Sequence, residues 1–364
     1  MTVLDNVWAL PASGVVVGCL MGFIARRNHF CAMSALERYW YGGNDEGLRA
    51  WALAAATALL ATQTMIALGI VDLATSFYLQ PAVPVAGSLI GGLMFGVGMA
   101  LVGTCGFGAV LRFGGGNLRA LVVLTGIGLA AIAAQRGITG HFRIAAIEPL
   151  SIDLGQGQSQ SLGAIASRAI GYDVAYGVAL LVAAGMLAWI FSSAGFRRNR
   201  SGIVSGTAIG LCISAGWFAT SYFSDRLLSG VQLEAGSFVT PVGDTILQLI
   251  TVTGFGPDYG VGLVVGVFVG AAIAAWRAND VRWEACDDAR ELGRHLLGAF
   301  LMGTGGVFAL GCTIGQGVSA VSLMAVSAPL TLAGIVFGAR MGLGYLVEGA
   351  PFAFLRVQRQ TPAG

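Results

Sequence analysis

Apolar residues gather in about nine stretches along the chain, each close to the roughly 20 residues that a helix needs to cross a lipid bilayer. Polar or glycine-rich segments separate them. The pattern predicts an all-α polytopic membrane protein with about nine transmembrane helices. The expected spans are residues 12–30, 48–70, 85–104, 118–135, 174–192, 202–219, 259–277, 294–311 and 328–346.

The segments between these spans carry further signals. Residues 30–40 (FCAMSALERYW) are too short to cross a bilayer and are amphipathic at best, which is typical of a short re-entrant helix. Residues 141–170 form an expected polar loop that includes the run GQGQSQS. Residues 197–200 (RRNR) are interpreted as a hinge. The threonine–proline pair at 240–241 predicts the start of a short helix, because proline is favoured at the first helical position.

The composition agrees with a membrane location. The chain is 56% hydrophobic and only 10% charged, and its mean hydropathy of +0.78 lies far outside the range of soluble globular proteins. A net charge of +2 implies no nucleic-acid partner. Six cysteines occur without C-x-x-C or Cys/His spacing, so neither a disulfide framework, a metal site nor a cofactor is expected. The N-terminal residues lack a basic region, and no cleavable signal peptide is expected.

Two glycine-rich segments that contain a cysteine resemble each other. GVGMALVGTCGFG, at residues 96–108, resembles GTGGVFALGCTIGQG, at residues 303–317. The helix that begins in the segment 303–317 is expected to stop at Gly311–Cys312 and to restart after a break at Gly315–Gly317. Interior glycines weaken a helix, although small residues also let membrane helices pack closely. When Cys105 is set against Cys312, four glycine pairs align without a gap: Gly91 with Gly298, Gly96 with Gly303, Gly98 with Gly305, and Gly108 with Gly315.

A second glycine ladder extends the repeat. Gly14, Gly18 and Gly22 match Gly202, Gly206 and Gly210. This second alignment sets Cys31 opposite Ala219, so that three of four equivalent positions hold cysteine. The expected organisation is a first repeat over 1–140, a connecting region over 141–201 with the polar loop, the fifth span and the hinge, a second repeat over 202–346, and a cytoplasmic tail over 347–364.

The arginines indicate the orientation. Most of them follow the first, third, fifth and seventh spans, which by the positive-inside rule places the N-terminus outside and the C-terminus in the cytoplasm. The first span corresponds to the sixth and the third to the eighth. This odd offset reverses direction, so the two halves are predicted to be inverted relative to each other in the membrane. Inverted repeats with broken helices are an architecture of transporters, whose substrate binds where the repeats meet.

Three segments resemble the signature segments of the YeeE/YedE family of sulfur-transport proteins: FCAMSALER (30–38), GTCGFGAVLR (103–112) and GCTIGQGVSA (311–320). The resemblance extends from the first span to the ninth. It implies an hourglass of two inverted halves, with Cys31, Cys105 and Cys312 at its constriction. It also implies import of thiosulfate or a related sulfur anion across the bacterial inner membrane. Three cysteines match no motif and are interpreted as packing or surface residues: Cys19, Cys212 and Cys286.

A doubly charged anion is costly to desolvate, so its site must supply compensating dipoles. Helices that restart after Cys105 and Cys312 would direct N-terminal N–H groups to the centre, each end carrying roughly half a positive charge. Thiols would add weak, polarizable contacts to a substrate sulfur. Arg112 is either an anion attractor or an ordinary cytoplasmic arginine, and Gln316 and Ser319 donate either to substrate or to free backbone groups. The supporting set is completed by Gly106, Gly108, Gly311, Gly315 and Gly317.

Two alternatives remain open at this point. A membrane thiol–disulfide or persulfide-exchange enzyme would require two thiols within disulfide reach and one activated nucleophile. A passive small-anion channel could have the same fold. The favoured hypothesis is a transporter without enzymatic activity, whose partners are the lipid bilayer, a small sulfur anion and a cytoplasmic sulfurtransferase.

Overall fold

The computed structural model describes residues 3–155, 158–225, 231–251, 256–286 and 288–350. This part of the chain is mostly helical, and its only strands are β1 (Ala82–Val83) and β2 (Ile152–Asp153), which pair antiparallel. Eight of its helical segments are long and apolar enough to cross a membrane. The prediction of an all-α polytopic membrane protein is confirmed.

The helices of the first half are α1 (Val3–Arg27), α2 (Ala32–Gly42), α3 (Glu46–Ala67), α4 (Val85–Val102), α5 (Gly106–Gly114) and α6 (Leu118–Arg136), with a 3₁₀ turn, η1, at Phe77–Leu79. Those of the second half are α11 (Arg200–Ser224), α12 (Thr240–Ile250), α13 (Tyr259–Arg277), α14 (Ala289–Phe308), the π-helical turn η4 (Gly315–Ala320) and α15 (Ser327–Glu348). The expected short helices at 30–40 and after residue 240 are α2 and α12.

One predicted span, 294–311, coincides with α14 but is not among the eight apolar segments. The reason lies in its first turns, where Arg290, Glu291 and Arg294 lower the apolar content of the helix. Arg119 of α6 forms an ion pair with Glu291 at 2.7 Å. The rest of α14 is largely buried against α4 and α6.

The connecting region is more structured than a loop. It contains α7 (Ile138–Phe142), the turns η2 (Arg143–Ile147) and η3 (Glu148–Leu150), strand β2, α8 (Leu162–Ile170), α9 (Ala175–Ser192) and α10 (Ala194–Arg198). The expected polar loop at 141–170 is therefore wrong for most of its length, because β2 pairs with β1 and Ser161 hydrogen-bonds to Leu323. Residues 197–200, the expected hinge, comprise the end of α10, the turn residue Asn199 and the first residue of α11.

The antiparallel helices α4 and α14 touch through their backbones. A Cβ added at Gly98 would lie 2.5 Å from the carbonyl oxygen of Gly298, and one added at Gly305 would lie 2.6 Å from that of Gly91. The sequence alignment pairs Gly91 with Gly298 and Gly98 with Gly305. Each contact is therefore the image of the other, as a two-fold axis perpendicular to the two helices would produce.

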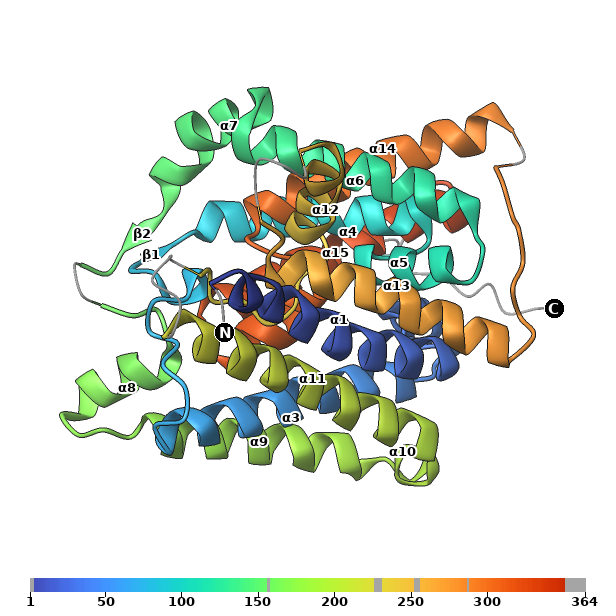
Figure 1. Ribbon diagram of the computed structural model, residues 1–364. Coiled ribbons are helices and arrows are strands. Elements are labelled where there is room, and N and C mark those ends of the chain that lie inside the picture. Colours follow the sequence, from blue (N-terminus) through green and yellow to red (C-terminus); the bar gives the residue numbers. More distant parts are fainter. Residues whose placement is uncertain (1–2, 156–157, 226–230, 252–255, 287, 351–364) are drawn as a thin grey trace.

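Helices of the first half pack mainly on helices of the second half. The glycine ladder of α1 packs on the backbone of α13, and the matching ladder of α11 packs on α3, where a Cβ at Gly210 would lie 2.5 Å from the carbonyl oxygen of Ala54. In the same way α4 packs on α15 and α14 packs on α6. Close helix packing is thus one role of the glycines. Figure 1 shows α1, α3, α9, α11 and α13 running side by side across the molecule.

The two ends of this bundle differ in charge. At one end, on the left of Figure 1, lie β1, β2, α7 and α8, and we call it the strand face. At the other end lie α2, α10 and the connections 115–117 and 278–286, which we call the arginine face. Its loops are joined by polar contacts, among them the ion pair between Arg26 and Asp280 at 3.0 Å. Most of the described arginines lie at this face.

Candidate functional site

The break between α4 and α5 places Cys105 inside the protein. Helix α4 ends where Gly103 takes a left-handed conformation, with φ of 75°, and α5 begins at Gly106. Cys105 is the N-cap of α5 and is fully buried. Its Sγ accepts a hydrogen bond from the backbone N–H of Gly108 at 3.5 Å, which satisfies one of the free donors of a helix start.

The break after α14 places Cys312 in a similar setting. Leu310 has φ of 55° and Gly311 has φ of 157°, which reverses the chain after the helix. Sγ of Cys312 accepts a hydrogen bond from the backbone N–H of Gly315 at 3.5 Å. The helix resumes directly at Thr313, so the expected break at Gly315–Gly317 is wrong, and those residues lie in the π-helical turn η4.

Cys31 occupies a third break. It is the N-cap of α2, follows the left-handed residue His29 and is partly buried. Its Sγ lies 4.0 Å from Oγ1 of Thr104, the residue before Cys105. It also lines a cavity of about 90 Å³ at the arginine face. The half-buried thiol therefore stands between that face and the buried thiol of Cys105.

The three thiols predicted from the sequence come together. The Cys105 thiol lies close enough to those of Cys31 and Cys312 to interact with both electrostatically, and it lies beside the hydroxyl of Thr313. Oγ1 of Thr313 is buried and makes no regular hydrogen bond. A buried hydroxyl without a partner is uncommon, so this oxygen is a candidate contact for a bound anion.

Sequence reasoning missed Ser237. Its hydroxyl lies beside the Cys312 thiol, together with the backbone N–H groups of Phe238 and Ile314. A Cβ added at Gly315 would lie 3.3 Å from Oγ of Ser237. These donors surround Cys312 with positive dipole ends, which is an arrangement that favours an anion.

Ser237 also takes the fourth position of the repeat. A Cβ at Gly108, the partner of Gly315 in the alignment, would lie 3.7 Å from Sγ of Cys31, so Cys31 and Ser237 occupy corresponding places. The position expected for Ala219 is therefore wrong, because Ala219 lies inside the continuous helix α11. The available signal was the predicted start of α12, three residues after Ser237.

The remaining supporting residues shape the breaks. A Cβ at Gly106 would lie 2.5 Å from the carbonyl oxygen of Phe238, and one at Gly311 would lie 3.3 Å from the hydroxyl of Tyr78. Gly317 packs near Leu332 of α15 and lies away from the thiols' hydrogen-bond partners. A close backbone contact thus restricts position 106 to glycine, and the positive φ of 157° favours glycine at position 311.

Two polar side chains near Cys312 bond to the backbone. Nε2 of Gln316 donates to the carbonyl oxygen of Ala309 at 2.7 Å, and the Ser319 hydroxyl donates to that of Gly236 at 2.9 Å. Oε1 of Gln316 is buried without a partner. Ser319 therefore stabilises the fold, and Gln316 stabilises the end of α14 while one of its atoms stays unpaired.

A cavity opens toward the thiols from each face. At the arginine face, a cavity of about 240 Å³ includes Thr104, which contacts Cys31, and also Arg112. Arg112 donates from Nη2 to the carbonyl oxygen of Gly103 at 2.9 Å, so it both supports the break before Cys105 and adds positive charge. At the strand face, a cavity of about 300 Å³ includes Ser237.

The other three cysteines lie elsewhere. Cys19 is on α1 where it packs on α13, and Cys212 is buried within α11. Sγ of Cys286 lies 3.9 Å from Nδ1 of His295 near the arginine face. None of the three is an N-cap of a described helix, which separates them from Cys31 and Cys105.

Apolar helices form a bundle that is interrupted at buried thiols and has a cavity at each face. This is the architecture of a membrane transport protein. The chain belongs to the sulphur-transport family, whose profile matches residues 27–341. This confirms the family expected from the three cysteine segments.

Two curated relatives extend the similarity over most of the chain. The thiosulfate transporter TsuA of Escherichia coli (strain K12) is 26% identical over 340 residues, covering 87% of this chain and 89% of that protein. The thiosulfate transporter TsuA of Spirochaeta thermophila is 26% identical over 335 residues, covering 90% of this chain and 96% of that protein.

Proposed function

We propose that this protein carries thiosulfate across the bacterial inner membrane, by way of Cys105, Cys312 and Cys31. The observation that carries the proposal is the position of the buried thiols at helix breaks between two cavities. The names of the two relatives indicate the substrate. A soft sulfur atom of the substrate suits polarizable thiols, whereas its oxygens suit N–H and hydroxyl donors.

The charge balance favours passage over trapping. The helix starts after Cys105 and Cys312 supply about half a positive charge each, so together they leave a dianion partly uncompensated. The hydroxyls of Thr313 and Ser237 supply further donors without a full charge. Since a site that binds too tightly does not release its ion, this weak excess of negative charge suits transport.

The two halves act as inverted repeats about the crossing of α4 and α14, supported by the reciprocal contacts of Gly98 and Gly305. We assign the first repeat to 1–140 and the second to 202–346. The positive-inside rule assigns the arginine face to the cytoplasm, with the N-terminus outside. The tail predicted at 347–364 lies outside the described residues from position 351 onward.

In this transport cycle the thiols act as hydrogen-bond donors and form no covalent bond with the substrate. A cytoplasmic sulfurtransferase would receive the thiosulfate at the arginine face. In the persulfide-exchange alternative, one thiol would instead carry a sulfur adduct during turnover. A passive channel would show no saturation.

Uptake of labelled thiosulfate into proteoliposomes tests the function. We expect saturable uptake that unlabelled thiosulfate inhibits more strongly than sulfate or selenite, because only thiosulfate offers a terminal sulfur to the thiols. Liposomes without protein provide the background. Uptake that never saturates would identify a channel, and a lack of uptake above background would contradict the proposal.

Ser237→Ala is expected to raise the KM for thiosulfate about fivefold, since it removes one hydrogen-bond donor worth about 1 kcal/mol beside Cys312. Ser237→Cys, which restores the thiol found at the corresponding place in the first half, should stay within about twofold of the unmodified protein. Initial rates of uptake over a range of concentrations measure both. An unchanged KM in Ser237→Ala would show that this hydroxyl does not contact the anion.

A further inference from the structure

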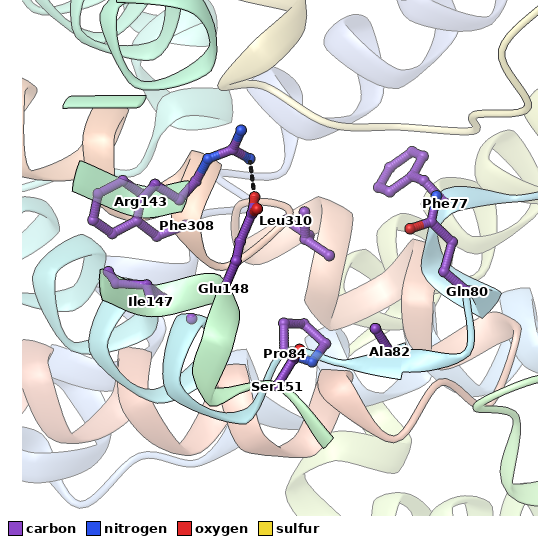
Figure 2. A pocket seen from close by; sticks show the side chains of 11 residues that line it. Phe77, Gln80, Ala82, Pro84, Arg143, Ile147, Glu148, Ser151, Phe308 and Leu310 are labelled. Atoms are coloured by element: carbon purple, nitrogen blue, oxygen red, sulfur yellow. Dashed lines mark ion pairs between the residues drawn. The ribbon is translucent and has the colours of Figure 1, made fainter. Parts of the chain in front are cut away.

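Two cavities at the strand face meet at one arginine. One cavity, of about 310 Å³, is lined by Gln80, Ser151 and Glu148, and we call it the outer cavity. The other, of about 300 Å³, is called the inner cavity because it reaches Ser237 beside Cys312. Arg143 lines both. Figure 2 shows its guanidinium above the outer cavity, directed at the carboxylate of Glu148. An anion that enters the outer cavity and moves on toward Ser237 therefore passes this side chain.

The partners of Arg143 leave its charge largely available. Nη1 lies 3.6 Å from Oε1 of Glu148, which is an ion pair too long for a good hydrogen bond. The Glu148 side chain is 52% exposed, whereas that of Arg143 is 21% exposed. Nε of Arg143 is buried and has no hydrogen-bond partner. A long ion pair with a half-exposed carboxylate contributes little stability. A doubly charged anion can therefore replace the carboxylate beside Arg143.

We propose that Arg143 is a capture site for a small doubly charged oxoanion at the strand face, and that Glu148 is its internal competitor. The inference rests on the proposed function and extends it to the place where substrate first binds. A planar guanidinium can donate two parallel hydrogen bonds to one oxoanion. The carboxylate of Glu148, at 3.6 Å from Nη1, leaves these donors available. Gln80 and Ser151 supply polar neighbours at the same cavity.

The charges deeper in the protein explain why capture occurs at this point. The inner cavity contains Arg136 but also the carboxyl groups of Glu234 and Asp244. Burial raises the pKa of Glu234 to about 8, so this carboxyl group is mostly protonated near pH 7, whereas Asp244, with a pKa of about 6, is mostly charged. Asp244 therefore repels a dianion in the inner cavity, and Arg143 is the favourable position before it. When the anion leaves for the thiols, Glu148 re-forms its pair with Arg143 and lowers the cost of release. The competitor thus keeps the capture site weak.

The test compares two substitutions of opposite sign, Arg143→Gln and Glu148→Gln, in thiosulfate uptake by cells that produce the full chain. Arg143→Gln should raise KM about tenfold, and Glu148→Gln should lower it about threefold, because one removes the anion's partner and the other its competitor. Both maximal rates should stay near that of the unmodified protein, since neither residue lies at the thiols. The rise of KM with added salt should be smaller in Arg143→Gln.

Arg168→Gln is the matched control. Arg168 lies at the same face, is hydrogen-bonded to Gln158 at 2.6 Å and lines neither cavity, so its loss changes the net charge equally and should leave KM within about twofold. A purely structural ion pair predicts that both substitutions impair uptake alike, and that result would overturn the inference. An unchanged KM in both variants would do the same.

The outcomes stay distinguishable if one variant fails to insert. If Arg143→Gln fails, Glu148→Gln decides, and a KM that is unchanged or raised overturns capture by Arg143. If Glu148→Gln fails, Arg143→Gln decides against Arg168→Gln, and a KM equal to that of this control overturns it. Absence of uptake by the unmodified protein would overturn the proposed function, and this inference with it. Normal uptake with no response to Glu148→Gln would overturn only the inference.

Discussion

Cys105→Ser and Cys312→Ser are each expected to reduce thiosulfate uptake by at least about tenfold while the protein still inserts and folds. Serine keeps a donor at the helix break and occupies less space, so the local fold should survive. It replaces a soft, polarizable sulfur by a harder oxygen that contacts a substrate sulfur less favourably. Alanine at either position removes the donor as well and should be at least as damaging.

Uptake per inserted protein in proteoliposomes measures this effect. Cys19→Ser is the control, because Cys19 lies on α1 at the contact with α13 and outside both cavities that lead to the thiols. If Cys105→Ser and Cys312→Ser both transported at the rate of this control, the thiols would not line the pathway. Mass spectrometry of protein stopped during uptake separates the covalent alternative, which requires a stoichiometric sulfur adduct on one of these cysteines.

Gly98→Ala and Gly305→Ala are expected to lower the thermal unfolding midpoint in detergent by about 5 °C each, since forcing a methyl group into a tight contact costs about 1–3 kcal/mol. In both cases the new Cβ would meet a backbone carbonyl oxygen of the facing helix, at 2.5 Å and 2.6 Å respectively. Backbone atoms cannot rotate away as a flexible side chain can. Similar losses are expected because the two contacts correspond to each other.

Gly293→Ala is the matched control on α14, where a Cβ would have no neighbour within 4 Å. Alanine has the higher helix propensity, so this variant should be neutral or slightly stabilising. Equal midpoints for Gly98→Ala and Gly293→Ala would contradict the close backbone contact between α4 and α14. A large loss in only one of Gly98→Ala and Gly305→Ala would contradict the two-fold relation of the halves.

Most of the fold was predictable because a bilayer imposes a simple length and composition on each crossing. An apolar run such as that of α13 can be recognised as a membrane span without any knowledge of the helices that pack on it. The internal repeat could be recognised from its aligned glycines, because close backbone contacts restrict positions such as Gly91 and Gly298 to glycine. Family membership followed from the three cysteine segments, and the profile match confirms it.

The rest depended on contacts between distant parts of the chain. The region 141–170 has polar composition, yet β2 and α8 form there because β1 and the residues near Met324 offer partners. Ser237 carries no local signature, and only the approach of its hydroxyl to Cys312 reveals it. Helical structure at Gly315 was unexpected because glycine disfavours it, but the side chain of Gln316 bonds back to Ala309 and stabilises the turn.

The exchange of helices between the halves has a consequence for biosynthesis. Helices α1, α3 and α4 find their main partners in α13, α11 and α15, all of which are made after residue 199. While the ribosome is still in the first half, these apolar helices can insert, but the sides that later touch backbone, lined by glycine in α1 and α4, face lipid. Insertion and packing are therefore separated in time. A chain released at residue 199 would reside in the membrane without the contacts that give the protein its shape.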